Sequence, residues 1–230
     1  MTTWMFGKSS AFSREIIKKL DNPVCFGRDN IDYNDVQSFI NDHVGNYFNG
    51  LKMDTKTPLN IVFNVHLNQD AHNNEELHES LDKFKEFFMD FSPVVFFMFK
   101  LLVELNRLKI PVRVCYTTST FGNTNAYDHK SHLPSSTNPQ NIFLNKSGGL
   151  LTNSAFKYAT ARLAQQQAFI SNISPTCRVL GVNPAGLDTE NMVDYATTIS
   201  EMLYAPWDDE QWNRIYCLRW DMWYATKLSQ

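Results

Sequence analysis

The chain has few cysteines, and no pair of them has the spacing of a zinc or redox motif. They are scattered along 230 residues, at Cys25, Cys115, Cys177 and Cys217. Three of the four lie in apolar runs. This pattern excludes a disulfide scaffold or a cysteine-based zinc module, and we expect buried, reduced thiols.

Three further absences narrow the class of protein. No basic stripe stands out in a chain of net charge -3, so we expect no nucleic-acid partner. The most apolar stretch, Pro93 to Leu105, contains Lys100 and Glu104 and is too short to span a bilayer. The first residues lack the long apolar stretch of a signal peptide. We therefore expect a cytoplasmic protein without a membrane segment.

The chain contains enough apolar residues for one large core. The length of 230 residues and a hydrophobic content of 43% predict a single domain over residues 1–230. Short apolar runs typical of buried strands occur at Trp4–Phe6, Val24–Phe26, Asn60–Asn64, Val112–Tyr116 and Arg178–Val182. Segments of helical period alternate with them, at Ser13–Leu20, Asp35–Tyr47, Leu77–Leu108 and Asn153–Ile173.

This alternation predicts an α/β fold. Because no hairpin signature joins the apolar runs, we expect a doubly wound, mostly parallel sheet with helices on both faces. The segment Leu77–Leu108 is long enough for two helices, which we expect to be broken near Ser92–Pro93. Ligands of such sheets bind beyond the carboxyl ends of the strands.

Two regions do not fit the alternation. Residues 123–149 are polar and predict a long loop or lid, which is uncommon in a compact domain and often functional. Residues 204–230 form an aromatic-rich tail whose tryptophans could line a pocket, form an interface or pack in the core. His129 and His132 in the polar insert lack a third fixed ligand, so we expect no metal site.

Tyr158 and Arg162 are four residues apart in a segment of helical period. Side chains at this spacing share a helix face, so the cation can stabilise a phenolate and make the phenol a better proton donor. An ordinary half-buried tyrosine with a solvated arginine would show the same spacing. The order of the surrounding motifs favours the chemical interpretation.

That order resembles the short-chain dehydrogenase/reductase family, from about Trp4 to about Leu203. The segments that carry the resemblance are Phe6–Ser13, Gly27–Asp29, Asp32–Asp35, Asn64, Thr118–Gly122, Tyr158 with Arg162, and Asn183–Thr189. The resemblance implies a Rossmann-type fold that binds a nicotinamide dinucleotide. It also implies a small carbonyl or alcohol substrate and a homodimer or homotetramer.

The resemblance implies NADP in preference to NAD, because Arg28 follows the second strand and can pair with a 2′-phosphate. The cofactor contacts that it implies are Gly7, Lys8, Ser9, Ser10, Phe12, Arg28, Asp32, Asn64, Arg162, Pro184, Gly186 and Thr189. Ser9 and Ser10 would serve equally well as ordinary helix caps.

The resemblance also implies three catalytic residues. Tyr158 would exchange the proton at the substrate oxygen, Arg162 would lower the pKa of Tyr158, and Ser119 would donate a hydrogen bond to the developing oxyanion. Thr117, Thr118 and Thr120 are alternatives to Ser119, although Gly122 three residues on favours the serine.

The chain departs from the family pattern at three places. Ala11 and Ser13 replace two glycines of the first turn, and Arg162 replaces a lysine. The methyl of Ala11 and the bulk of Ser13 predict weaker or shifted cofactor binding. These departures favour a second interpretation, a non-catalytic nucleotide-binding sensor or interaction protein on the same fold.

Overall fold

The computed structural model describes residues 2–45, 57–65, 80–117, 176–184, 191–208, 212, 214–218 and 223–227. The strands are β1 (Thr3–Phe6), β2 (Pro23–Phe26), β3 (Leu59–Phe63), β4 (Val112–Thr117), β5 (Cys177–Pro184), β6 (Arg214–Leu218) and β7 (Trp223–Lys227). The helices are α1 (Ala11–Lys19), α2 (Val36–Phe39), a π-helical continuation η1 (Ile40–Gly45), α5 (Leu81–Arg107) and α8 (Asn191–Leu203). The five predicted strands are confirmed, and so is their alternation with helices, except between β4 and β5, where the predicted helix lies outside the described residues.

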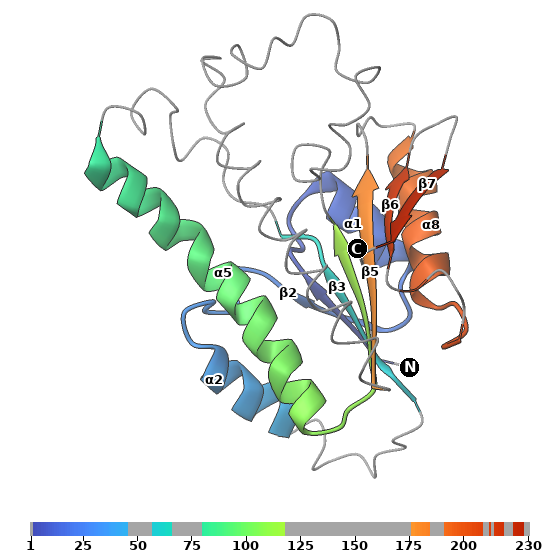
Figure 1. Ribbon diagram of the computed structural model, residues 1–230, viewed down its shortest axis with the longest axis horizontal. Coiled ribbons are helices and arrows are strands. Elements are labelled where there is room, and N and C mark those ends of the chain that lie inside the picture. The colour runs from blue at the N-terminus through green and yellow to red at the C-terminus, as the bar shows by residue number, and fades with distance from the viewer. Residues whose placement is uncertain are drawn as a thin grey trace, which may run out of the picture.

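The strands form one sheet in the order β2-β1-β3-β4-β5-β6-β7 (Figure 1). All neighbouring pairs are parallel except β6 and β7, which are antiparallel. The predicted doubly wound, mostly parallel sheet is therefore confirmed. Strands β6 and β7 come from the aromatic tail, for which we predicted no strand.

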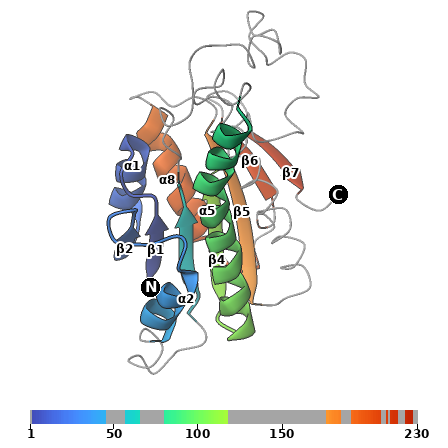
Figure 2. The same ribbon diagram turned by 90° about the vertical axis from the view of Figure 1, so that its left-hand side faces the viewer.

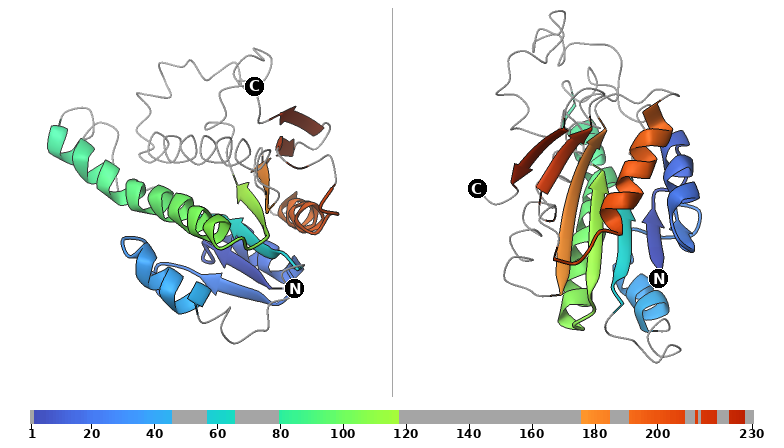
Figure 3. Two further views of the ribbon diagram at one scale, coloured as in Figure 1. Left: turned by 60° about the horizontal axis from the view of Figure 1, so that its bottom comes forward. Right: turned by 90° about the vertical axis from the view of Figure 1, so that its right-hand side faces the viewer.

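Helices cover both faces of the sheet, as expected (Figure 3). Helices α2 and α5 close one core, in which Phe6, Phe63 and Phe97 form an aromatic cluster. Helices α1 and α8 close the other, built around Met5 and Ile16. The two cores separate because successive side chains of a strand point to opposite faces.

Helix α5 corrects one prediction, since it runs from Leu81 to Arg107 without a break. Pro93 lies inside it and removes one backbone hydrogen bond. The helix continues because Val94, Phe97 and Met98 are buried against the sheet directly after the proline, and this burial outweighs the lost bond. Figure 2 shows the helix as one rod in front of the sheet.

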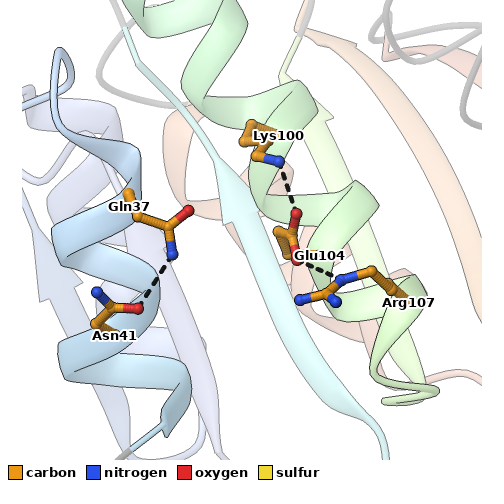
Figure 4. A network of polar contacts seen from close by, with 5 residues as sticks. All are labelled: Gln37, Asn41, Lys100, Glu104 and Arg107. Carbon is orange, nitrogen blue, oxygen red and sulfur yellow. Dashed lines mark hydrogen bonds and ion pairs between the residues drawn. The ribbon is translucent and has the colours of Figure 1, made fainter.

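The last turns of α5 carry a charged group centred on the buried residue Glu104. The carboxylate of Glu104 lies 2.6 Å from Lys100 Nζ and 2.7 Å from Arg107 Nε, and these hydrogen bonds hold its pKa below the usual range. Figure 4 shows this group beside Gln37 and Asn41, whose amides bond each other on the neighbouring helix. Both sets join residues one helical turn apart and stabilise their helices locally.

The described cysteines match the expectation of reduced thiols. Cys25, Cys115 and Cys177 are all free, and the last two are buried. Burial raises the pKa of Cys115 and of Cys177 to about 12, so both are inert thiols near neutral pH. Among the described helices, none is long and apolar enough to cross a membrane.

The sheet changes direction at β1, whose neighbours are β2 on one side and β3 on the other. Gly7 follows β1 with φ +88. A Cβ at this position would overlap the carbonyl oxygen of Asn64 and would lie 2.9 Å from Val65 Cα. Two backbones therefore pass each other here at a distance that only glycine permits.

We expect Gly7→Ala to lower the free energy of unfolding by about 2–4 kcal/mol, because the methyl group adds backbone strain and a clash with fixed main-chain atoms. Urea unfolding followed by circular dichroism measures the loss. Gly27→Ala is the matched control. Its Cβ would meet the flexible side chains of Asp29 and Lys8. We expect a loss of less than about 1 kcal/mol there. Equal losses in the two variants would contradict the prediction.

Candidate functional site

Three strand ends meet at the place where the sheet changes direction. Phe6 of β1 is in register with Phe26 of β2 and with Phe63 of β3. The Gly7 N–H donates to the Phe26 carbonyl at 2.8 Å, and the Asn64 N–H donates to the Phe6 carbonyl at 2.9 Å. The loops after these strands therefore diverge from one point, which is the position of the ligand crevice in doubly wound sheets.

A cleft of about 510 Å³ lies at this point. Its lining residues are Gly7, Lys8, Ser9, Ser10, Gly27, Arg28, Asp29, Tyr33, Asn64 and Val65. The predicted cofactor residues Gly7, Lys8, Ser9, Ser10, Arg28 and Asn64 are thus brought together by the fold. They come from three loops that are far apart in the sequence.

One wall of the cleft is the start of helix α1. Ser10 is its N-cap, and the Ser10 side chain accepts a hydrogen bond from the Ser13 N–H at 3.0 Å. The capping role considered for this serine is therefore confirmed. Lys18 and Lys19 lie in the last turn, where their positive charges interact favourably with the negative end of the helix dipole. The amino end of α1 gives the cleft a partial positive charge.

Charged side chains form another part of the cleft wall. Lys8 Nζ lies 2.7 Å from a carboxylate oxygen of Asp29, and this ion pair joins the first turn to the loop after β2. The hydrogen bond from Lys8 lowers the pKa of Asp29, which is therefore anionic at neutral pH. Arg28 is exposed in the same wall. The wall thus carries two cations and one anion.

Tyr33 forms the floor beside these charges. Its ring is buried and packs edge-on against Phe97 of α5 with ring centroids 5.1 Å apart. Burial raises the pKa of Tyr33 to about 12, so the phenol stays protonated at neutral pH. It offers the cleft an apolar ring and a neutral hydroxyl group.

Behind the cleft lies a buried polar network. Asn64 Nδ2 donates to Ser13 Oγ at 2.8 Å, and the Thr117 hydroxyl donates to Asn64 Oδ1 at 2.6 Å. Ser13 Oγ also contacts the Gly7 carbonyl and lies 2.7 Å from Ser10 Oγ. The network links the first turn to the ends of β3 and β4.

Three other predicted residues do not line the cleft. The Phe12 side chain is buried in the core beneath α1, so only its backbone is placed to meet a ligand. Asp32 accepts hydrogen bonds from the backbone and side chain of Asn34 and shapes the turn before α2. Pro184 is the last residue of β5.

The remaining predicted residues lie outside the described part of the chain. They are Ser119, Tyr158, Arg162, Gly186 and Thr189, together with the helix predicted at Asn153–Ile173 and the polar insert. Thr117 is the last described residue of β4, two positions before Ser119. No group of three metal-ligating side chains occurs among the residues that the structure describes.

Sequence reasoning missed part of the lining and the role of Ser13. Gly27, Asp29, Tyr33 and Val65 line the cleft, although we did not predict them as site residues. Asp29 adjoins Arg28, and that adjacency was the available signal. We expected Ser13 only to add bulk, yet it is fully buried and hydrogen-bonded. Its position three residues after the cap was the available signal.

Comparison with known proteins identifies the fold. No family model matches the sequence, and no curated protein matches it. Many solved structures do match the fold. A short chain dehydrogenase from Bacillus anthracis aligns with TM-score 0.57 and 11% identity over 91% of this chain and 90% of that chain.

Some of the similar structures contain a cofactor, as two examples show. The 3-ketoacyl-(acyl-carrier-protein) reductase from Brucella melitensis, complexed with NADH, aligns with TM-score 0.53 and 14% identity over 80% of this chain and 74% of that chain. ElxO with NADP bound aligns with TM-score 0.56 and 11% identity over 91% of this chain and 92% of that chain. The fold of this chain is therefore the Rossmann-type fold of short-chain dehydrogenase/reductases.

Proposed function

We propose that the protein is an NAD(P)-dependent oxidoreductase of the short-chain dehydrogenase/reductase type, acting on a small carbonyl or alcohol substrate. The observation that carries this proposal is the cleft at the switch point of the sheet, lined by Gly7 and the amino end of α1. A pyrophosphate fits such a place because backbone N–H groups and the helix dipole both favour an anion.

The fold neighbours support a nicotinamide cofactor. The Brucella melitensis reductase is complexed with NADH, and ElxO has NADP bound. In this chain, Gly7 and the amino end of α1 line the cleft, and Lys8 and Arg28 add positive charge to it. The residues present therefore fit the diphosphate of a dinucleotide.

A bound nicotinamide would supply the hydride for a carbonyl carbon or accept it from a carbinol carbon. Tyr158 would give or take the proton at the substrate oxygen. Arg162 would lower the pKa of Tyr158 and orient the nicotinamide ribose, and Ser119 would donate a hydrogen bond to the oxyanion. These roles rest on the sequence resemblance.

NADP is our preferred cofactor. Arg28 is exposed on the cleft wall and is free to meet a 2′-phosphate with a charge-assisted contact. Asp29 would repel that phosphate, but Lys8 lies 2.7 Å from its carboxylate and compensates the charge. The net positive charge of this wall favours NADP over NAD.

A second function has its own support. Ser10 caps α1 and Lys8 is paired with Asp29, so two of the predicted phosphate contacts already have partners within the protein. This arrangement favours a nucleotide-binding sensor or interaction protein that lacks turnover. Catalytic assay of a cofactor-bound protein separates the two functions.

A homodimer is the assembly we propose. Exposed apolar side chains recur at helical spacing along the outer side of α5: Leu81, Phe88, Met89, Phe96 and Phe99. From Val94 to Leu105 the opposite side of the helix is buried on the sheet, so α5 carries apolar side chains on two of its sides. The exposed apolar side needs a second surface to pack against. The same stripe on a twofold-related copy of the chain provides a self-complementary surface.

The direct test of the function is titration with NADPH and with NADH, followed by tryptophan fluorescence. Binding of NADPH supports the proposal. A native protein that binds neither dinucleotide would contradict both the reductase and the nucleotide-sensor functions.

We expect NADPH to bind more tightly than NADH, and Arg28→Ala to remove the difference. The contact is worth about 1.5–3 kcal/mol, or roughly 10- to 150-fold in affinity. Arg107→Ala is the control, because Arg107 is an exposed arginine that pairs with Glu104 on α5. Equal affinities of the native protein for the two cofactors would show that Arg28 does not select NADP.

We expect Tyr158→Phe to lower turnover by roughly 10²- to 10⁴-fold while NADPH still binds, because the variant loses the proton donor and keeps the ring. Arg162→Ala should lower turnover and cofactor affinity together, whereas Arg162→Lys should be tolerated. The measurement is NADPH consumption over a panel of small aldehydes and ketones. Unchanged activity in Tyr158→Phe would assign the proton transfer to another residue.

We expect the native protein to sediment as a dimer and the double variant Phe96→Glu/Phe99→Glu to sediment as a monomer, because two buried charges on the stripe would oppose association. Val193→Glu is the matched control, since Val193 is an exposed apolar residue on α8. Sedimentation velocity at tens of micromolar protein measures the mass. A monomeric native protein at that concentration would exclude this interface.

A further inference from the structure

The hydroxyl of Ser13 occupies a place where the family pattern has glycine. Ser13 lies in the first turn of α1 and is fully buried. Its oxygen contacts the Gly7 carbonyl and lies 2.7 Å from Ser10 Oγ and 2.8 Å from Asn64 Nδ2. One small side chain thus bonds three residues beside the cleft, two in the turn after β1 and one after β3.

The direction of each hydrogen bond follows from the groups involved. The Asn64 amide nitrogen is only a donor, so Ser13 Oγ accepts from it. The Gly7 carbonyl is only an acceptor, so it accepts a hydrogen bond from the Ser13 hydroxyl. Ser10 must then donate to Ser13, while its own oxygen accepts from the Ser13 N–H. The Ser13 hydroxyl acts as donor and acceptor at once.

The network extends to a third strand. Because the Asn64 nitrogen faces Ser13, its oxygen faces Thr117, which donates to it at 2.6 Å. Thr117 is also buried and ends β4. Hydrogen bonds that are shielded from water hold their partners firmly, and each strengthens its neighbour.

We infer that Ser13 is a positioning residue for dinucleotide binding, which holds the Gly7 carbonyl and the Asn64 side chain in fixed places behind the cleft. This inference rests on the proposed function. Gly7, Ser10 and Asn64 all line the cleft, and Ser13 bonds each of them. A glycine at this place would leave the Gly7 carbonyl and the Asn64 amide without this partner. The serine therefore supports cofactor binding, contrary to the expectation from its bulk.

The test compares Ser13→Gly and Ser13→Ala with the control Ser200→Ala. Ser200 is a buried serine of α8 whose hydroxyl donates to the Lys19 carbonyl at 2.8 Å, at the far end of α1. All three variants lose one buried hydroxyl that bonds a backbone carbonyl. NADPH and NADH affinities and urea midpoints are measured for each.

We expect both Ser13 variants to bind NADPH roughly 10-fold more weakly than the native protein, because the Gly7 carbonyl and the Asn64 side chain are then less firmly held in place before the ligand binds. Ser200→Ala should keep its affinity within about 2-fold, although its urea midpoint falls as well. Binding by Ser13→Gly that equals or exceeds native binding would overturn the inference. A native protein that binds neither dinucleotide would overturn the proposed function with it.

A ligand-free measurement tests the network itself. Ser13→Ala and Thr117→Val should each lower the free energy of unfolding. In the double variant the two losses should not add, because both residues bond Asn64. The losses caused by Ser200→Ala and Thr117→Val should add, since Ser200 bonds Lys19 and Thr117 bonds Asn64. Additive losses for Ser13 and Thr117 would show that Asn64 does not couple them, and would overturn the inference whatever the cofactor result.

Discussion

Two backbones pass each other at Gly7 so closely that only glycine fits there, and this contact sets the positions of the strand ends around the cleft. The chain leaves β1 with a positive φ and runs directly against the Asn64 carbonyl after β3. Any Cβ at this point would push the two strand ends apart. The sheet reverses its winding at the same place, so the same contact that joins the strands also opens the cleft.

The polar groups around this contact follow from its tightness. Loop backbone near a buried strand end needs hydrogen-bond partners, and little room is left for water. Ser13, Asn64 and Thr117 supply side-chain partners behind the cleft, where all three are buried. On the open side, Lys8 and Asp29 pair with each other across two loops. The interior is thus held by neutral hydrogen bonds and the rim by charge.

Helix α5 shows how burial can override a local signal. Pro93 predicts a break because it removes a backbone donor, yet the helix passes through it. Val94 and Phe97 follow immediately and are buried against the sheet, so ending the helix would expose them. The same helix keeps Phe96 and Phe99 exposed on its outer side. A sequence that is apolar on both sides of a helix therefore shapes the fold and the proposed interface together.

The α/β class, the first five strands and six of the lining residues could be predicted from the sequence, because short apolar runs between helical periods specify buried parallel strands. The tertiary structure was needed for three other features. It placed β6 and β7 of the tail in the same sheet, carried α5 through Pro93, and turned Ser13 into a buried link. Each depends on a partner distant in the chain, and local patterns carry no information about that partner. The pairing of Lys8 with Asp29 has the same origin, since β1 and β2 bring their loops together only once the sheet has formed.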